Sequence, residues 1–315
     1  MLFPDIVPDL KEQLPGLRGA LAANAALGKL TTFHAGGAAQ VLFKPEDEED
    51  LSYFLSRLSE DIPVTIVGRG SNLLVRDAGV PGIAVRLGSG FNQINTDSPP
   101  RMQVGGATPD VMIAYAAQKS GIAGFSFLCG IPGFVGGTLR MNGGCYKSEI
   151  KDVLKSVRAV DRKGQVHVLK KDEIKFEYRF CDMPQDFIVT QVELEGAPGD
   201  PADIAAEMTK ITAEREEHQP PVKMRTGGST FKNPSGKRAW ELIRQAGCGQ
   251  LRIEGAEVSS KHANFLINYD RAAAAAIETL GETIRQRVKE NSGIDLEWEV
   301  QRIGLEEPFS GAHAL

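Results

Sequence analysis

The chain has 315 residues, of which 42% are hydrophobic and 24% are charged, and its net charge is −5. This length predicts two or three domains. The acidic balance argues against non-specific nucleic-acid binding, which needs a basic face to neutralise phosphates. No apolar run approaches the length that spans a membrane. We therefore expect neither a nucleic-acid partner nor membrane insertion, and no obligate protein partner is evident.

The cysteines and the N-terminal residues indicate the compartment. Cys129, Cys145, Cys181 and Cys248 show neither CxxC pairing nor metal-ligand spacing. They predict reduced thiols and no metal site. The first residues lack the apolar stretch of a signal peptide. Together these features favour a cytoplasmic location.

Helical and strand patterns alternate along the first part of the chain. Residues 46–59 repeat leucine and phenylalanine at helical spacing, so they predict an amphipathic helix. Strands are expected at 64–68 and 80–87. A further helix is expected over 108–121, starting from Thr108 as its N-cap.

The second half continues the mixed pattern. Residues 156–169 predict a hairpin that turns at Lys163-Gly164, and 186–195 predict a strand. The glycine- and proline-rich segment 196–203 is the clearest linker candidate. A helix with Ile204, Met208 and Ile211 on one face follows it. The remaining elements are helices near 238–246 and 271–292 and a last strand at 295–304.

Two glycine-rich stretches are suited to holding phosphate: "VGRGSNLLV" (67–75) and "CGIPGFVGGTLRMNGG" (129–144). Neither fits the Walker A loop or the GxGxxG fingerprint. Both present successive backbone N–H groups with no side chains in the way, and Ser71 and Asn72 add further donors. A turn explains any single glycine, but the glycine density of the second stretch favours a bound dinucleotide.

The segment "GGSTFKNP" (227–234) has two interpretations. One is a tight turn with a surface lysine. In the other, the glycines let the backbone approach a ligand, while Lys232 and Asn233 supply a cation and an amide. Elsewhere, Arg179 alone would be a surface arginine and Glu299 an outward residue of an edge strand. These residues do not decide between the interpretations by themselves.

Seven motifs occur in a recognisable order: "TTFHAGG" (31–37), "GRGSNLLV" (68–75), "GIPGFVGGTLRMNGG" (130–144), "EYR" (177–179), "GGSTFKNP" (227–234), "SSKHANFLIN" (259–268) and "LEWEVQRIG" (296–304). Their order resembles that of the UDP-N-acetylenolpyruvoylglucosamine reductases. These flavoenzymes make UDP-N-acetylmuramate for bacterial peptidoglycan. The resemblance covers nearly the whole chain.

The resemblance implies an α+β fold. A vanillyl-alcohol-oxidase-type FAD-binding region of two α/β subdomains would occupy residues 1–200, split near 85–100. A C-terminal α/β substrate-binding lobe would span 201–297, and 298–315 would form a strand and tail that return to the active site. The direct passage from the strand at 186–195 into the third lobe resembles the shorter subtype, which lacks an extra substrate-lobe loop.

The resemblance also implies the chemistry. NADPH would reduce non-covalently bound FAD, and hydride would then pass from the flavin N5 to UDP-N-acetylglucosamine enolpyruvate. Ser229 would donate the proton, with Arg179 and Glu299 as the other catalytic residues. The UDP-sugar would be contacted by Lys232, Asn233, His262 and Asn264. The cofactor contacts would be Gly68, Arg69, Gly70, Ser71, Asn72, Gly130, Pro132, Gly133, Gly136, Gly137 and Asn142.

Three positions depart from the family pattern. His34 stands where arginine or lysine is usual, Arg140 where a neutral residue is frequent, and Cys181 where serine is common. The alternative is another FAD-dependent oxidase of the same fold, because one fold hosts several chemistries. A non-catalytic nucleotide-sugar binding protein is a further possibility. The C-terminal motifs and the paired glycine-rich stretches favour the reductase.

Overall fold

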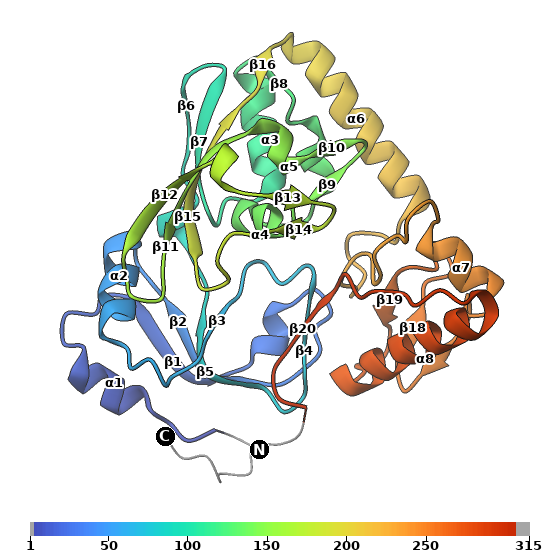
Figure 1. Ribbon diagram of the computed structural model, residues 1–315, viewed down its shortest axis with the longest axis horizontal. Helices are drawn as coiled ribbons and strands as arrows, with labels where there is room; N and C mark the ends of the chain where they lie inside the picture. Colours follow the sequence, from blue (N-terminus) through green and yellow to red (C-terminus); the bar gives the residue numbers. More distant parts are fainter. Residues whose placement is uncertain (1–2, 307–315) are drawn as a thin grey trace.

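The computed structural model describes residues 3–306, which form a first, a middle and a C-terminal unit (Figure 1). In the first unit, β2, β5 and β3 run parallel, and β1 joins antiparallel to β2, which gives the order β1-β2-β5-β3. Its elements are α1 (Val7–Gln13), β1 (Ala20–Ala25), β2 (Ala39–Lys44), α2 (Glu48–Arg57), β3 (Val64–Ile66), β4 (Leu73–Val75) and β5 (Val80–Val85).

Helix α2 forms where the apolar periodicity predicts it. Asp47 is its N-cap and accepts a hydrogen bond from the Asp50 backbone N–H at 3.0 Å. The buried face includes Phe54, which stacks on Phe43 of β2 with ring centroids 4.1 Å apart. Burying two aromatic rings against each other holds the helix on the sheet.

The middle unit is built on an antiparallel sheet of order β12-β11-β15-β7-β6. Helix α3 begins at Asp110 rather than after a Thr108 cap, because Pro109 occupies the N-cap position. The predicted hairpin at 156–169 is confirmed as β11 and β12. The elements are β6 (Ile94–Ser98), β7 (Arg101–Gly105), α3 (Asp110–Lys119), β8 (Ile122–Ala123), α4 (Val135–Arg140), β9 (Gly144–Cys145), β10 (Ser148–Glu149), α5 (Ile150–Val153), β11 (Leu154–Val160), β12 (Val166–Lys170), β13 (Phe176–Glu177), β14 (Phe180–Cys181), β15 (Ile188–Glu195), β16 (Ala197–Pro198) and α6 (Pro201–His218).

The division near residue 200 differs from the expectation. The segment 196–203 is no free linker, because β16 pairs with β8 and Asp200 caps α6, accepting from a backbone N–H at 2.7 Å. Ile204 and Met208 of α6 belong to the buried core of the middle unit. Figure 1 shows α6 running along the middle unit toward the C-terminal one. Judged by which residues pack together, the C-terminal unit therefore begins after His218.

The C-terminal unit consists of two helices and a short antiparallel sheet of order β17-β18-β19. Helix α8 ends at Ser292 and is capped by Gly293, whose φ of 73° is the left-handed conformation that glycine adopts without strain. Among residues 3–306, no helix is long and apolar enough to cross a bilayer. The elements are α7 (Ala239–Gln245), β17 (Arg252–Ile253), β18 (Ala256–Val258), β19 (Leu266–Asn268), α8 (Ala274–Ser292) and β20 (Gln301–Ile303).

The C-terminal unit is anchored to the first unit. Strand β20 runs parallel to β4, with Gln301 opposite Leu73 (Figure 1). Phe33 and Leu74 of the first unit lie in the same buried cluster as the residues of α7 and α8. The last segment therefore returns to the first unit. The rest of the predicted tail, 307–315, lies outside the described residues.

Candidate active site

Ser229 lies in a segment that backbone pairing holds on both sides. It forms an antiparallel bridge with Phe265. The next residue, Thr230, donates from its N–H to the Asn264 carbonyl at 2.7 Å and accepts from the Glu299 N–H at 2.8 Å. Thr230 is buried, whereas Ser229 is half-buried. The pairing therefore places Ser229 one residue from the backbone of Glu299.

The two glycines before Ser229 are required by the geometry. Gly228 has a φ of 78°, and a Cβ at Gly227 would lie 2.2 Å from the ring of Phe33. A Cβ at Gly228 would come within 4.0 Å of the Ser71 carbonyl oxygen. The bend thus brings the Ser229 segment up to the first glycine-rich stretch.

Arg179 and Glu299 form an ion pair beside this segment. The Arg179 Nε lies 2.7 Å from the Glu299 Oε1, and their side chains are 19% and 13% exposed. Burial raises the pKa of Glu299 above its ordinary value, while Arg179 and Lys232 oppose that shift. Two residues far apart in sequence, each unremarkable alone, therefore meet in one partly buried site.

A strained turn positions Arg179. The residue joins β13 to β14 with a φ of 56°, and its Nη2 donates to the Gly144 carbonyl at 3.3 Å. The buried Asn142 donates from its amide to the Glu177 carbonyl at 2.9 Å and accepts from the Lys151 N–H at 3.4 Å. In this structure the side chain of Asn142, predicted to contact the cofactor, braces the hairpin that carries Arg179.

The first glycine-rich stretch is linked directly to Glu299. Asn72 donates from its amide to the Glu299 carbonyl at 2.9 Å. The Gly70 carbonyl accepts from the Thr32 N–H at 3.0 Å, and the Thr32 hydroxyl donates to the Thr226 carbonyl at 2.6 Å. No described atom lies within 4 Å of the place where a Cβ would stand on Gly68. The stretch is therefore firmly held and leaves open space beside its backbone.

The second glycine-rich stretch curves from the middle unit into α4. A Cβ added to Gly137 would meet open space. A Cβ added to Gly136 would lie 2.9 Å from the Gly106 carbonyl oxygen. Arg215 of α6 donates to the Gly130 carbonyl at 3.0 Å, and Pro132 is exposed. Bare backbone facing open space on both stretches fits the pyrophosphate of a dinucleotide.

Two of the predicted substrate contacts lie near the surface of the C-terminal unit. Lys232 pairs with Glu297 at 2.5 Å, and its side chain is 22% exposed. Asn233 is exposed, and its side-chain oxygen accepts from the Ala239 N–H, the first residue of α7. The structure therefore brings Lys232 next to the Ser229 segment but uses the Asn233 carbonyl group to cap a helix.

The other two predicted contacts are more enclosed. The buried Asn264 amide donates to the Phe231 carbonyl at 2.8 Å and accepts from the Phe231 N–H at 3.0 Å. Both of its polar atoms thus support the Ser229 segment. Burial lowers the pKa of His262, and Arg244 and His218 add to that effect. The His262 ring packs edge-on against Phe265.

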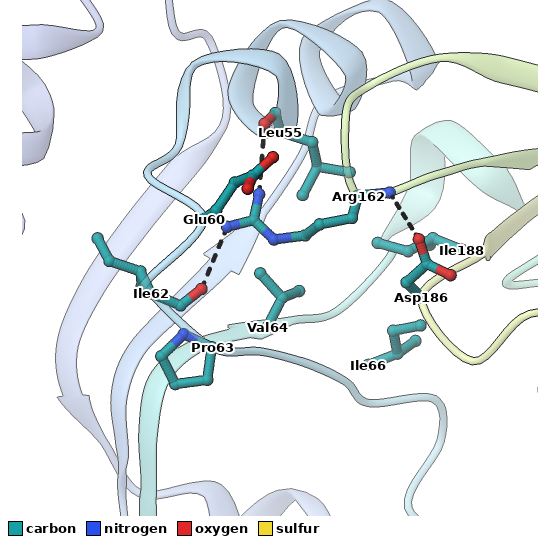
Figure 2. Close-up of a pocket in the computed structure, with 9 residues that line it drawn as sticks. All are labelled: Leu55, Glu60, Ile62, Pro63, Val64, Ile66, Arg162, Asp186 and Ile188. Carbon is teal, nitrogen blue, oxygen red and sulfur yellow. Dashed lines mark hydrogen bonds between the residues drawn. The ribbon is translucent and has the colours of Figure 1, made fainter.

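A separate cavity of about 120 Å³ lies between the first and middle units, away from these residues (Figure 2). None of the predicted site residues lines it. Arg162 crosses it and donates to the carbonyls of Leu55, Ser59 and Ile62, while Asp186 accepts from its backbone N–H. Pockets for small molecules have volumes of about 300–1,000 Å³, so this cavity is too small for a dinucleotide.

Two family models match the chain. The model of an FAD binding domain matches residues 39–170. The model of the C-terminal domain of UDP-N-acetylenolpyruvoylglucosamine reductase matches residues 219–303. The second match starts where the core of the middle unit ends, immediately after α6.

Named relatives extend over nearly the whole chain. The UDP-N-acetylenolpyruvoylglucosamine reductase of Azorhizobium caulinodans is 55% identical over 96% of this chain and 98% of its own length. That of Parvibaculum lavamentivorans is 50% identical over 99% of this chain and 100% of its own length. The chain belongs to the UDP-N-acetylenolpyruvoylglucosamine reductase family.

A solved structure agrees with this assignment. The UDP-N-acetylenolpyruvylglucosamine reductase of Thermus caldophilus is 32% identical, with a TM-score of 0.78 over 91% of this chain and 99% of its own. The predicted α+β fold with an FAD-binding region is confirmed. The chain is an FAD-dependent oxidoreductase of a family named for reducing a peptidoglycan precursor.

Two residues beside the candidate site could not be found from the sequence. Thr32 belongs to the motif at 31–37, yet only the structure shows that it ties the first glycine-rich stretch to the segment before Ser229. Asp110 looks like an ordinary acid in the first turn of a helix, but it is fully buried beside Gly133. Neither role leaves a local signal in the sequence, because both depend on distant neighbours.

Proposed function

We propose that the chain catalyses the NADPH-dependent reduction of UDP-N-acetylglucosamine enolpyruvate to UDP-N-acetylmuramate. The observation that carries the proposal is the Arg179–Glu299 pair, whose Glu299 backbone is hydrogen-bonded to the residue after Ser229. A cation and a partly buried carboxyl group thus lie beside the segment that carries the Ser229 hydroxyl, with contacts to both glycine-rich stretches. A cytoplasmic location remains a prediction.

The bare backbone near Gly68 and Gly137 would hold the FAD pyrophosphate non-covalently. Bound there, FAD supplies hydride transfer from NADPH to the substrate through its N5. The protein's part is to hold the two partners in succession and to orient the enolpyruvyl group. Lys232 supplies a positive charge next to the Ser229 segment that would attract an anionic UDP group.

Arg179 and Ser229 have complementary roles in this proposal. Hydride adds to the terminal enolpyruvyl carbon, and the electron pair of the double bond moves to the carbon beside the carboxylate. Arg179 stabilises the developing negative charge as a permanently charged guanidinium. Ser229 then gives its hydroxyl proton to that carbon, which forms the new C–H bond, and regains a proton from solvent.

Glu299 acts as a neutral acid in the loaded site. Burial already raises its pKa. A substrate carboxylate that shares Arg179 adds a second negative charge nearby, which raises the pKa further. The protonated carboxyl group then hydrogen-bonds the substrate carboxylate and helps the carbon beside it to accept electron density.

The proposal is tested with Ser229→Ala in anaerobic stopped-flow absorbance. Flavin reduction by NADPH should stay within about twofold of the wild type, whereas reoxidation by the enolpyruvyl substrate should slow by about 10²–10⁴-fold, the usual contribution of a general acid. Ser235→Ala, a change at an exposed serine directly after this segment, is the matched control and should leave both steps unchanged.

Two results would contradict the proposal. If both half-reactions of Ser229→Ala survive, Ser229 is not the proton donor. If the wild-type flavin stays reduced until air is admitted, the chain is an oxidase of the same fold.

A further inference from the structure

Asp110 is a buried acid directly behind the second glycine-rich stretch. It is the first residue of α3 and is fully buried. Its N–H donates to the Gly133 carbonyl at 3.2 Å. A Cβ placed on Gly133 would lie 2.7 Å from the Asp110 Oδ2. The carboxyl group thus packs against the backbone that the proposed function assigns to the FAD pyrophosphate.

This carboxyl group has little to stabilise a charge. The Thr138 hydroxyl donates to Oδ2 at 2.6 Å. The other oxygen, Oδ1, is buried without a hydrogen-bond partner in the described part of the chain. Within residues 3–306, no ion pair includes Asp110. A buried carboxylate supported only by neutral donors is unfavourable, so the geometry favours the protonated acid.

The charged groups around Asp110 do not reverse this preference. Burial raises its pKa to about 7, against the opposing effects of Thr138, of Arg69 in the first glycine-rich stretch and of the Gly133 backbone. Cys145 also faces it, but burial raises the pKa of that thiol to about 12, so it stays neutral. Asp110 therefore changes charge near neutral pH with one cation in its surroundings, the exposed Arg69.

We propose that Asp110 is a positioning residue that must be neutral for the second glycine-rich stretch to hold the FAD pyrophosphate, so that FAD binding takes up one proton. The inference rests on the proposed function. A carboxylate behind Gly133 would repel the two negative charges of a pyrophosphate held by this stretch, because buried protein screens charges poorly. Taking one proton from solvent removes that repulsion without breaking any other bond.

The experiment uses flavin-free protein and follows FAD binding by fluorescence from about pH 6 to 9. The dissociation constant of the wild type should be constant on the acid side. It should then rise by up to about tenfold per pH unit once Asp110 ionises in the free protein. Calorimetry in buffers of different ionisation enthalpy should detect uptake of about one proton on the alkaline side.

Asp110→Asn should bind FAD with no pH dependence and no proton uptake, because its amide still accepts from Thr138 but cannot ionise. Thr138→Val removes the donor that stabilises the carboxylate, so the affinity should begin to fall at a higher pH than in the wild type. This second variant tests the inference even if Asp110→Asn does not fold. Asp203→Asn, at an exposed acid in the first turn of α6, should behave as the wild type.

The outcomes separate the inference from the proposed function. FAD binding that is independent of pH in the wild type, or that keeps its pH dependence in Asp110→Asn, overturns the role of Asp110 alone. Failure of the wild type to bind FAD at any pH overturns the proposed function and this inference with it.

Discussion

At the scale of single residues, the site contains two acids that burial affects in the same direction but whose partners differ. The pKa of both Glu299 and Asp110 is raised by desolvation. Glu299 has Arg179 at 2.7 Å, whereas Asp110 has a hydroxyl group. The first acid can therefore share a cation with an anionic substrate, whereas the second has no cation directly paired with it and ionises less readily than an exposed acid.

A double-mutant cycle on the ion pair tests this contrast. Arg179→Met leaves the Glu299 carboxyl buried with only Lys232 as a cationic neighbour, so the free energy of unfolding should fall. Adding Glu299→Gln removes the uncompensated charge and should restore part of the lost stability. The coupling energy between the two residues should be about 1–3 kcal/mol in urea denaturation.

The pH dependence of the same variant has a definite sign. The Glu299 pKa should rise further in Arg179→Met, so the folded state holds its proton more tightly than the unfolded chain does. The stability of that variant should then decrease as the pH rises through the raised pKa. Equal losses in the single and double mutants, with no pH dependence, would show that the two charges do not interact.

At the scale of secondary-structure elements, α8 shows that a helix can depend on another unit for its cap. Its N-cap residue is Ala273, which has no side-chain hydrogen bond. Asp77 of the first unit instead accepts from the Ala274 N–H at 3.0 Å and the Ala275 N–H at 2.9 Å. A residue about 200 positions away therefore satisfies the first turn of the helix.

Asp77→Ala should lower the free energy of unfolding by about 1 kcal/mol, the usual cost of losing an N-cap. Hydrogen exchange in the first turn of α8 should speed up in that variant, because the cap lies between two units. Asp200→Ala removes an ordinary local cap, that of α6, and should leave exchange in α8 unchanged. If exchange in α8 does not change in Asp77→Ala, the cross-unit cap contributes nothing to the helix.

At the scale of the whole molecule, polar bridges set the relative placement of the units. The Glu48 carboxylate of α2 accepts from Arg158 of β11 at 2.7 Å and from the Thr190 hydroxyl of β15 at 2.5 Å. These contacts join the first unit to the central strands of the middle unit. Since the two glycine-rich stretches belong to these two units, the bridge holds the two sides of the proposed FAD site together.

Glu48→Gln should weaken this bridge. Burial opposes the ionisation of Glu48, but Arg158 and Thr190 outweigh it, so its pKa lies below the ordinary value. The contribution to stability is therefore present above the pKa of the unfolded chain and is lost as the pH falls through the lower folded value. At pH 7 we expect a loss of about 1–3 kcal/mol in urea denaturation, as for hydrogen bonds to charged groups.

Glu49→Gln is the matched control, because the Glu49 side chain is 92% exposed and lies 3.7 Å from its nearest cation, Arg18. It should change stability by less than about 0.5 kcal/mol. If Glu48→Gln is as stable as this control and its acid sensitivity is unchanged, the bridge does not help to hold the two units together.

Much of the fold could be predicted because amphipathic periodicity is local. The helix at 46–59 and the hairpin at 156–169 appear at the predicted places, as α2 and as β11 and β12. The placement of α6 could not be predicted. Its apolar stripe shows that one face is buried, but periodicity carries no information about which unit covers that face.

The sequence by itself determined the family, the two glycine-rich stretches and the order of the motifs, because these are properties of neighbouring residues. Only the tertiary structure decided which polar groups meet. Arg179 and Glu299 are 120 positions apart, and Asn72 reaches the Glu299 carbonyl across 227. The tertiary structure also removes water from around the Asp110 carboxyl group and places the Asn264 amide where it supports the Ser229 segment. Desolvation and hydrogen bonding depend on what packs against a residue, and a linear pattern does not specify that neighbour.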